Sequence, residues 1–125
     1  MSSRKTLVTL LSSIVLVSPF LTTTTQAQVN PTYCTWITPN DLRSTNGAPL
    51  RSVDQIIQQD RANVHKFGNP DRDQVDPIFT SYEKRLALAE AVRRSDISPG
   101  VRNAILNGNA TVCVFFYGNT VDIVQ

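Results

Sequence analysis

Two cysteines in a chain of 125 residues are the feature that most constrains the fold. Cys34 lies in the strand-forming segment YCTWIT, and Cys113 lies in the strand-forming segment ATVCVFFY. An even cysteine count in an exported chain indicates one disulfide, which would here close a loop of about 80 residues. The chain-entropy model gives such a bond roughly 4 to 5 kcal/mol of stabilisation. A reactive thiol is the weaker alternative, because neither cysteine belongs to a CxxC motif or adjoins a basic cluster.

The prediction of export rests on the first 27 residues. Arg4 and Lys5 form a basic start, residues 7–21 are apolar but diluted by Ser and Thr, and Ala27 offers a small residue for cleavage. This pattern is typical of a secretory signal peptide. A membrane anchor is the alternative, but the apolar run of about 15 residues is shorter than the roughly 20 needed to span a bilayer. We therefore predict a signal peptide over residues 1–27 and a single periplasmic or secreted domain over residues 28–125, not embedded in a membrane after cleavage.

The charge balance argues against nucleic-acid binding. The whole chain carries 12 basic and 10 acidic residues. Removal of Arg4 and Lys5 with the signal peptide leaves ten of each, so the remaining domain is formally neutral. No block of Lys and Arg is left that could neutralise a run of phosphates. We expect a protein or a small ligand as the partner.

The end of the chain predicts a β-hairpin. Gly118-Asn119 separates two strand-forming runs and is a two-residue turn signal. A two-residue turn at this position pairs Phe116 with Val121 and Val114 with Ile123, so one face of the hairpin is apolar. The opposite face is mixed and carries Cys113, Phe115 and Tyr117. A strand over residues 33–38 would lie beside it if the cysteines are bonded.

Three helices are predicted between these strands. The first spans residues 52–67, with Ser52 and Gln55 as a capping box and Gly68 as its stop. The second begins between residues 76 and 80, capped by Asp76 or Thr80, and runs to about residue 94. The third, short helix spans residues 98–107. We predict an α+β fold, in which a short antiparallel sheet of the N-terminal strand and the C-terminal hairpin packs against a helical hairpin and a third short helix.

A helical wheel of the first helix places Asp60 inside the buried stripe and His65 on the solvent flank. The apolar stripe also includes Phe67, and the corresponding arc of the second helix includes Tyr82. A buried carboxylate needs a partner. Arg85 lies in the apolar arc of the second helix, so we predict a structural Asp60–Arg85 ion pair. The alternative cations for Asp60 are Arg61 and Arg93.

The segment NPDRDQVD offers a second type of site. Its side-chain oxygens suit Ca²⁺, which takes six to eight oxygen ligands. Gln74 replaces the usual turn glycine, and Arg72 would repel a cation, so a plain loop is the alternative. The candidate metal ligands are Asn69, Asp71, Asp73 and Asp76.

The sequence leaves three functional hypotheses open. The first is a non-enzymatic accessory or binding protein that offers Trp36, Phe115 and Tyr117 on the mixed sheet face to an unknown partner. The second is an exported module that binds calcium through residues 69–76; the other two need no cofactor. The third is a small hydrolase that uses His65 with Asp60 or Asp71. No nucleophile motif accompanies this histidine, so the chain is more readily a binding protein than an enzyme.

Overall fold

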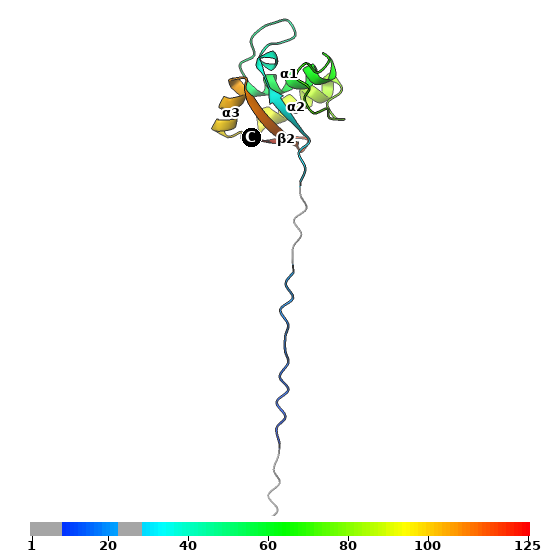
Figure 1. Ribbon diagram of the computed structural model, residues 1–125, viewed down its shortest axis with the longest axis vertical. Coiled ribbons are helices and arrows are strands. Elements are labelled where there is room, and N and C mark those ends of the chain that lie inside the picture. Colours follow the sequence, from blue (N-terminus) through cyan, green and yellow to red (C-terminus); the bar gives the residue numbers. More distant parts are fainter. Residues whose placement is uncertain (1–8, 23–28) are drawn as a thin grey trace, which may run out of the picture.

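The computed structural model describes residues 9–22 and 29–125 (Figure 1). Residues 9–22 form no helix or strand, and their side chains are exposed. No helix in the described part of the chain is long and apolar enough to cross a membrane. The predicted cleavage site at Ala27 lies outside the described residues, as do Arg4 and Lys5. The signal peptide therefore stays a prediction.

The sheet has three antiparallel strands in the order β1-β2-β3. They are β1 (Tyr33–Ile37), β2 (Ala110–Phe116) and β3 (Val121–Val124). The hairpin register is the predicted one, with Phe116 opposite Val121 and Val114 opposite Ile123. Gly118 adopts a φ of 91°, a conformation that glycine takes at no steric cost, which explains why the turn forms there.

The predicted disulfide is confirmed. Cys34 and Cys113 lie opposite each other on β1 and β2 and are bonded. The bond therefore joins the N-terminal strand to the C-terminal hairpin, two elements separated by the whole helical part of the chain. The two strands are far apart in sequence, so bringing them together costs the unfolded chain much entropy. The disulfide reduces this cost, because it already closes the long loop in the unfolded chain.

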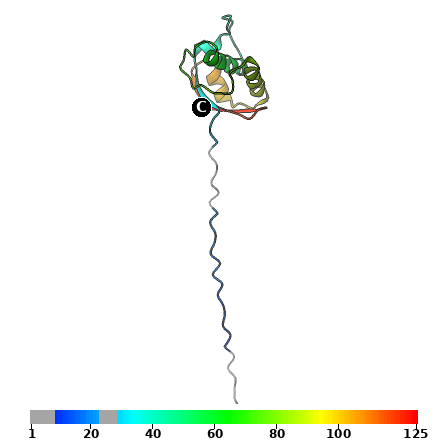
Figure 2. The same cartoon turned by 90° about the vertical axis from the view of Figure 1, so that its right-hand side faces the viewer.

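Helices cover one face of this sheet (Figure 2). They are the 3-10 helix η1 (Pro39–Leu42), α1 (Val53–His65), α2 (Tyr82–Arg94) and α3 (Pro99–Leu106). The α+β prediction is confirmed. Between the helices and the sheet lies a core whose centre is Phe79. Its ring makes edge-to-face contacts with Tyr33 at 5.8 Å and with Phe116 at 5.2 Å between ring centroids.

Several helix ends differ from the prediction. Ser52 makes no side-chain cap hydrogen bond, so the predicted capping box is absent. Helix α1 ends at His65, two residues early, and Phe67 therefore leaves the buried stripe and is exposed. Helix α2 begins at Tyr82, where Ser81 rather than Thr80 caps it by accepting from the Lys84 backbone N–H. The Tyr82 side chain is exposed as well.

Candidate functional site

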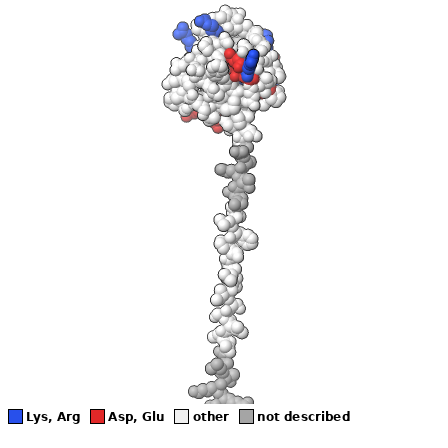
Figure 3. All heavy atoms as spheres, in the orientation of Figure 1, with Lys and Arg blue, Asp and Glu red and all other residues white. Residues whose placement is uncertain are grey.

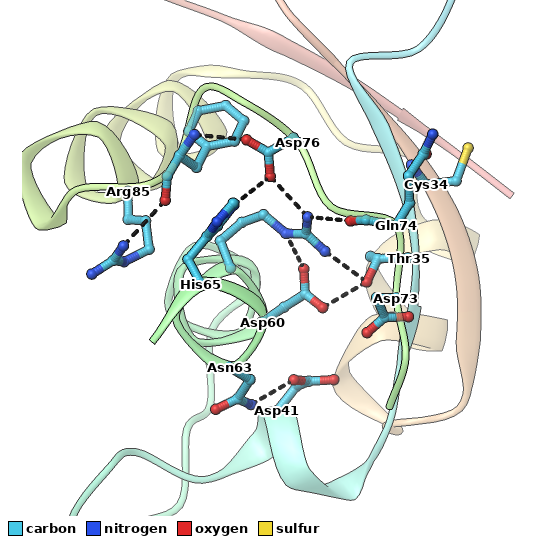
Figure 4. Close-up of polar contacts among 12 residues, drawn as sticks. Cys34, Thr35, Asp41, Asp60, Asn63, His65, Asp73, Gln74, Asp76 and Arg85 are labelled. Atoms are coloured by element: carbon cyan, nitrogen blue, oxygen red, sulfur yellow. Dashed lines mark hydrogen bonds and ion pairs between the residues drawn. The ribbon is translucent and has the colours of Figure 1, made fainter. Parts of the chain in front are cut away.

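The most concentrated chemistry in the molecule is a buried ionic cluster between β1, α1 and the loop that follows α1 (Figure 4). At its centre lies Arg61, whose side chain is 0% exposed. Its Nε donates to Asp60 Oδ2 at 2.8 Å, and its Nη1 donates to Asp76 Oδ2 at 2.9 Å. Nη1 also donates to the backbone carbonyl of Gln74 at 2.9 Å. One buried cation is thus balanced by two buried carboxylates.

Strand β1 completes the cluster. The Thr35 hydroxyl accepts from Arg61 Nη2 at 3.1 Å and donates to Asp60 Oδ1 at 2.6 Å. The Arg61 guanidinium also lies over the Tyr33 ring, 3.8 Å from its centroid, a cation–π contact. The Tyr33 hydroxyl is buried and has no hydrogen-bond partner in the described part of the molecule. The cluster therefore ties the first strand to the first helix.

The predicted Asp60–Arg85 ion pair is wrong. Asp60 is buried as expected, but its partner is Arg61, the weaker alternative. Arg85 instead donates from Nη1 to the backbone carbonyl of Phe79 at 3.1 Å. A helical wheel describes only the interface between two helices. It missed that residues 73–76 and strand β1 cover the flank of α1 on which Arg61 lies.

The prediction that His65 is exposed is also wrong. Its side chain is only 7% exposed, and Nε2 lies 2.8 Å from Asp76 Oδ2. The loop that contains residues 73–76 buries His65, because it folds back over the last turn of α1. Asp76 further accepts from the backbone N–H groups of Ile78 and Phe79, so this carboxylate is surrounded by donors.

The two carboxylates of the cluster differ in electrostatics. Burial raises the pKa of Asp60 to about 7, because the loss of water outweighs the attraction of Arg61. Burial also acts to raise the pKa of Asp76. There, however, the Phe79 backbone N–H, His65 and Arg61 stabilise the ionised form and hold the pKa below its ordinary value. Asp60 is therefore the carboxylate that takes up a proton first.

The geometry of this cluster is structural. Each of its charged groups contacts another member, and Asp60, His65 and Asp71 do not line the hollows beside the sheet face and beside α1 that are described below. Asp71 accepts from Thr38 and Asn40, away from His65. A hydrolase needs a nucleophile and a base that open onto a substrate cleft. The structure does not bring the predicted pair together at such a cleft.

Residues 69–76 cover the outer edge of β1. Gln74 Oε1 accepts from the Cys34 backbone N–H at 2.7 Å, and Asp73 Oδ1 accepts from that of Trp36 at 2.8 Å. These are the amides that an edge strand leaves unpaired. Side-chain oxygens here replace a neighbouring strand, which protects the edge from pairing with another chain.

The predicted calcium ligands are used up by these contacts. Asp71 and Asp73 bind different backbone and side-chain donors, Asp76 is buried against Arg61, and the Asn69 side chain bridges the Asp73 backbone. Across residues 9–22 and 29–125, no three His, Cys, Asp or Glu side chains are placed to hold a metal. The side-chain oxygens of this loop are bound to protein donors in the described chain, and the calcium site stays a prediction.

The predicted partner-binding residues lie on the outer sheet face, which the helices leave uncovered. Trp36 is 51% exposed and Tyr117 is 57% exposed, while Phe115 is half-buried between them. Most of the surface seen in Figure 3 is neither acidic nor basic. At one end of the face lies a hollow of about 550 Å³ whose lining includes Phe115, Tyr117, Asp96 and Asp122.

Comparisons with known proteins give no family. No family model, no curated protein and no solved structure matches the chain. The chemistry of the surfaces therefore has to carry the functional argument. Sequence reasoning missed Asp96 and ranked Arg61 too low. The one signal for Arg61 was its position directly beside a carboxylate that the helical wheel had already placed in the core.

Proposed function

We propose that the protein is a small exported, disulfide-bonded binding protein without catalytic activity, and that its outer sheet face binds a partner protein. The observation that carries the proposal is that Trp36, on β1, and Tyr117, directly after β2, are both more than half exposed, and that a disulfide joins these two strands. Tyr and Trp are the side chains that most often dominate binding energy at protein interfaces. Held on a rigid sheet, they lose little entropy on binding.

The shape of the face favours a protein partner. Its outward side chains run from Thr111 on β2 to Tyr117, the residue directly after β2, which at strand spacing is about 20 Å. Small ligands prefer concave pockets that bury most of their surface. A flat strip of this length, with the Cys34–Cys113 bond at its middle, suits an extended contact with another protein surface.

The hollow at one end of the face supports a basic partner. Asp96 and Asp122 both line it, and the lining contributed by the described residues includes no Lys or Arg. Phe115 and Tyr117 supply aromatic rings in the same hollow. Carboxylates beside aromatic faces bind an Arg or Lys side chain by charge-assisted hydrogen bonds and cation–π contact. The partner is thus expected to insert a basic side chain here.

Export is supported by the basic and apolar pattern of the first residues and by the disulfide. The absence of catalysis is supported by the ionic cluster, in which Asp60, His65 and Asp76 are occupied by one another or by Arg61. Both statements remain part of the proposal.

Photocrosslinking tests the proposed face. A photoreactive phenylalanine analogue replaces Val124, an exposed residue beside the hollow, in the producing cells. The expected result is a discrete adduct with one partner protein, which disappears when Asp122→Lys reverses the charge of the hollow. Glu90→Lys, on helix α2, is the matched control and should leave the adduct intact. No discrete adduct, or one that Asp122→Lys leaves unchanged, would contradict the proposal.

A further inference from the structure

A second surface has the opposite chemistry to the sheet face. Two adjoining hollows of about 510 and 550 Å³ lie between residues 39–50 and the outer side of α1. They adjoin, because Ser44, Thr45, Gln59 and Phe67 line both, and together they are here called the α1 groove. It reaches the start of α2 at Tyr82. None of its lining belongs to the sheet face.

Amide side chains line the floor of the α1 groove. Gln55, Gln58, Gln59 and Asn63 all belong to α1 and lie on one side of it, because residues three and four apart share a helix face. Gln59 donates to Asn63, and Asn63 donates to Asp41, so these two amides are partly engaged by the protein. Gln55 and Gln58 form no side-chain hydrogen bond within the described residues, and each of their amides offers both donors and an acceptor. Such a row matches a ligand that carries many hydroxyl groups.

The groove is electropositive. Arg43, Lys66 and Arg85 line it, whereas its described lining includes no Asp or Glu. Charge of one sign in a concave surface focuses the electrostatic field and concentrates ligands of the opposite charge. An anionic ligand is therefore favoured over a neutral or cationic one.

Arg85 supplies the sharpest observation. It is only 6% exposed, and its one side-chain hydrogen bond goes to the Phe79 carbonyl. Within the described chain, Arg85 forms no ion pair, and Asp60, its predicted partner, binds Arg61 and Thr35 instead. Figure 4 shows its guanidinium directed away from the ionic cluster. A buried cation with four unused N–H donors, lining a groove, is a ready partner for a carboxylate of a ligand.

Two exposed aromatic rings, Phe67 and Tyr82, border the groove at the Arg85 end. The Lys66 Nζ lies 5.4 Å from the centroid of the Phe67 ring, so a cation adjoins this aromatic surface. The apolar C–H face of a sugar ring stacks on such aromatics, while the sugar hydroxyls bind amides.

We propose that the α1 groove binds an acidic oligosaccharide, whose ring carboxylate is held by Arg85 and whose sugar rings stack on Phe67 and Tyr82. The α1 amides bind its hydroxyl groups. This ligand differs in class from the protein partner of the sheet face, and its site is independent of that proposal.

Calorimetric titration of the oxidised protein with a galacturonic acid hexamer tests this site. Wild-type protein should bind the hexamer, and a neutral maltose-type hexamer should bind at least about tenfold more weakly. Arg85→Met should raise the Kd at least about tenfold, and so should Phe67→Ala, which lies outside the core and keeps the test valid if Arg85→Met unfolds. The amide NH₂ signals of Gln55 and Gln58 should shift in NMR spectra on addition of the acidic hexamer.

Arg102→Met is the matched control, because Arg102 is an exposed arginine on α3 that does not line the groove. It should leave the Kd of the acidic hexamer unchanged. The proposal is overturned by an absence of binding at millimolar hexamer, or by equal affinity for the neutral sugar. It is equally overturned if Arg102→Met weakens binding as much as Arg85→Met, since the attraction would then be unspecific.

Discussion

The two buried arginines, Arg61 in α1 and Arg85 in α2, occupy opposite situations. Arg61 donates to two carboxylates, a hydroxyl and a carbonyl. Arg85 donates to a single carbonyl. Both are nearly inaccessible to solvent. A buried charge whose hydrogen-bonding capacity is used up by the protein holds the fold together, whereas Arg85, with spare capacity beside a groove, is the one we propose for a ligand.

The largest effect is expected on the structural side of this comparison. Strand β1, which supplies Thr35 to the Arg61 cluster, is also held by the disulfide. Replacing Cys34 and Cys113 by Ser together should lower the free energy of unfolding by up to about 4 to 5 kcal/mol, because the unfolded chain gains entropy. Urea unfolding of both proteins without reductant measures this loss. A variant as stable as the wild type would show that the ionic cluster alone fixes β1.

Asp60→Asn tests the electrostatics of the cluster through pH. The folded pKa of Asp60, about 7, lies above its ordinary value of 3.8. The stability that proton uptake by Asp60 contributes is therefore fully present below about pH 4 and is lost as the pH rises through 7. When the pH is lowered from 8 to 5, the free energy of unfolding of the wild type should rise, by a few kcal/mol at most. Asp60→Asn should lack this rise.

Thermal and urea unfolding between pH 5 and pH 8 measure this change in stability. His65→Asn is the control, because its imidazole contacts Asp76 and its variant should keep the gain from Asp60. Below about pH 4 the trend should reverse in the wild type, since the pKa of Asp76 is lowered and its protonation costs stability. Equal slopes for wild type and Asp60→Asn between pH 8 and pH 5 would mean that Asp60 remains ionised throughout.

A smaller effect is expected for His65→Asn itself at neutral pH. The imidazole contributes one of several contacts to Asp76, and its loss should cost about 1 to 2 kcal/mol. Lys66→Asn, at the exposed neighbouring position, should stay within about 0.5 kcal/mol of wild type. Urea unfolding of the two variants gives the comparison. If His65→Asn lowers the free energy of unfolding no more than Lys66→Asn does, His65 does not stabilise the cluster.

The fold could be predicted from the sequence where local signals determine it. Gly118-Asn119 defines the hairpin register, and the cysteine count in a chain with a predicted export signal predicts the bond between Cys34 and Cys113. The neighbours of Asp60 could not be predicted in the same way. They depend on how residues 69–76 fold over α1, and that loop is held by side-chain bonds from Asp73 and Gln74 to β1, which no periodicity records.

The surfaces were predictable only in part. The alternation of strand residues correctly placed Trp36 and Tyr117 on the uncovered face. The α1 groove was missed, because it depends on Phe67 leaving the helix and on residues 39–50 lying along α1. The polar positions in QIIQQ were visible in the sequence as an amide-rich side of α1. The role that we propose for them depends on Arg85, which has no carboxylate beside it in the described chain.

The contrast between the two arginines is tested most directly by urea unfolding of Arg61→Met and Arg85→Met side by side at pH 7. Arg61→Met strands two buried carboxylates and should cost about 3 to 5 kcal/mol. Arg85→Met leaves one carbonyl without its donor and should cost on the order of 1 kcal/mol. Equal costs, or a larger cost for Arg85→Met, would contradict the assignment of Arg61 to the fold and Arg85 to a ligand.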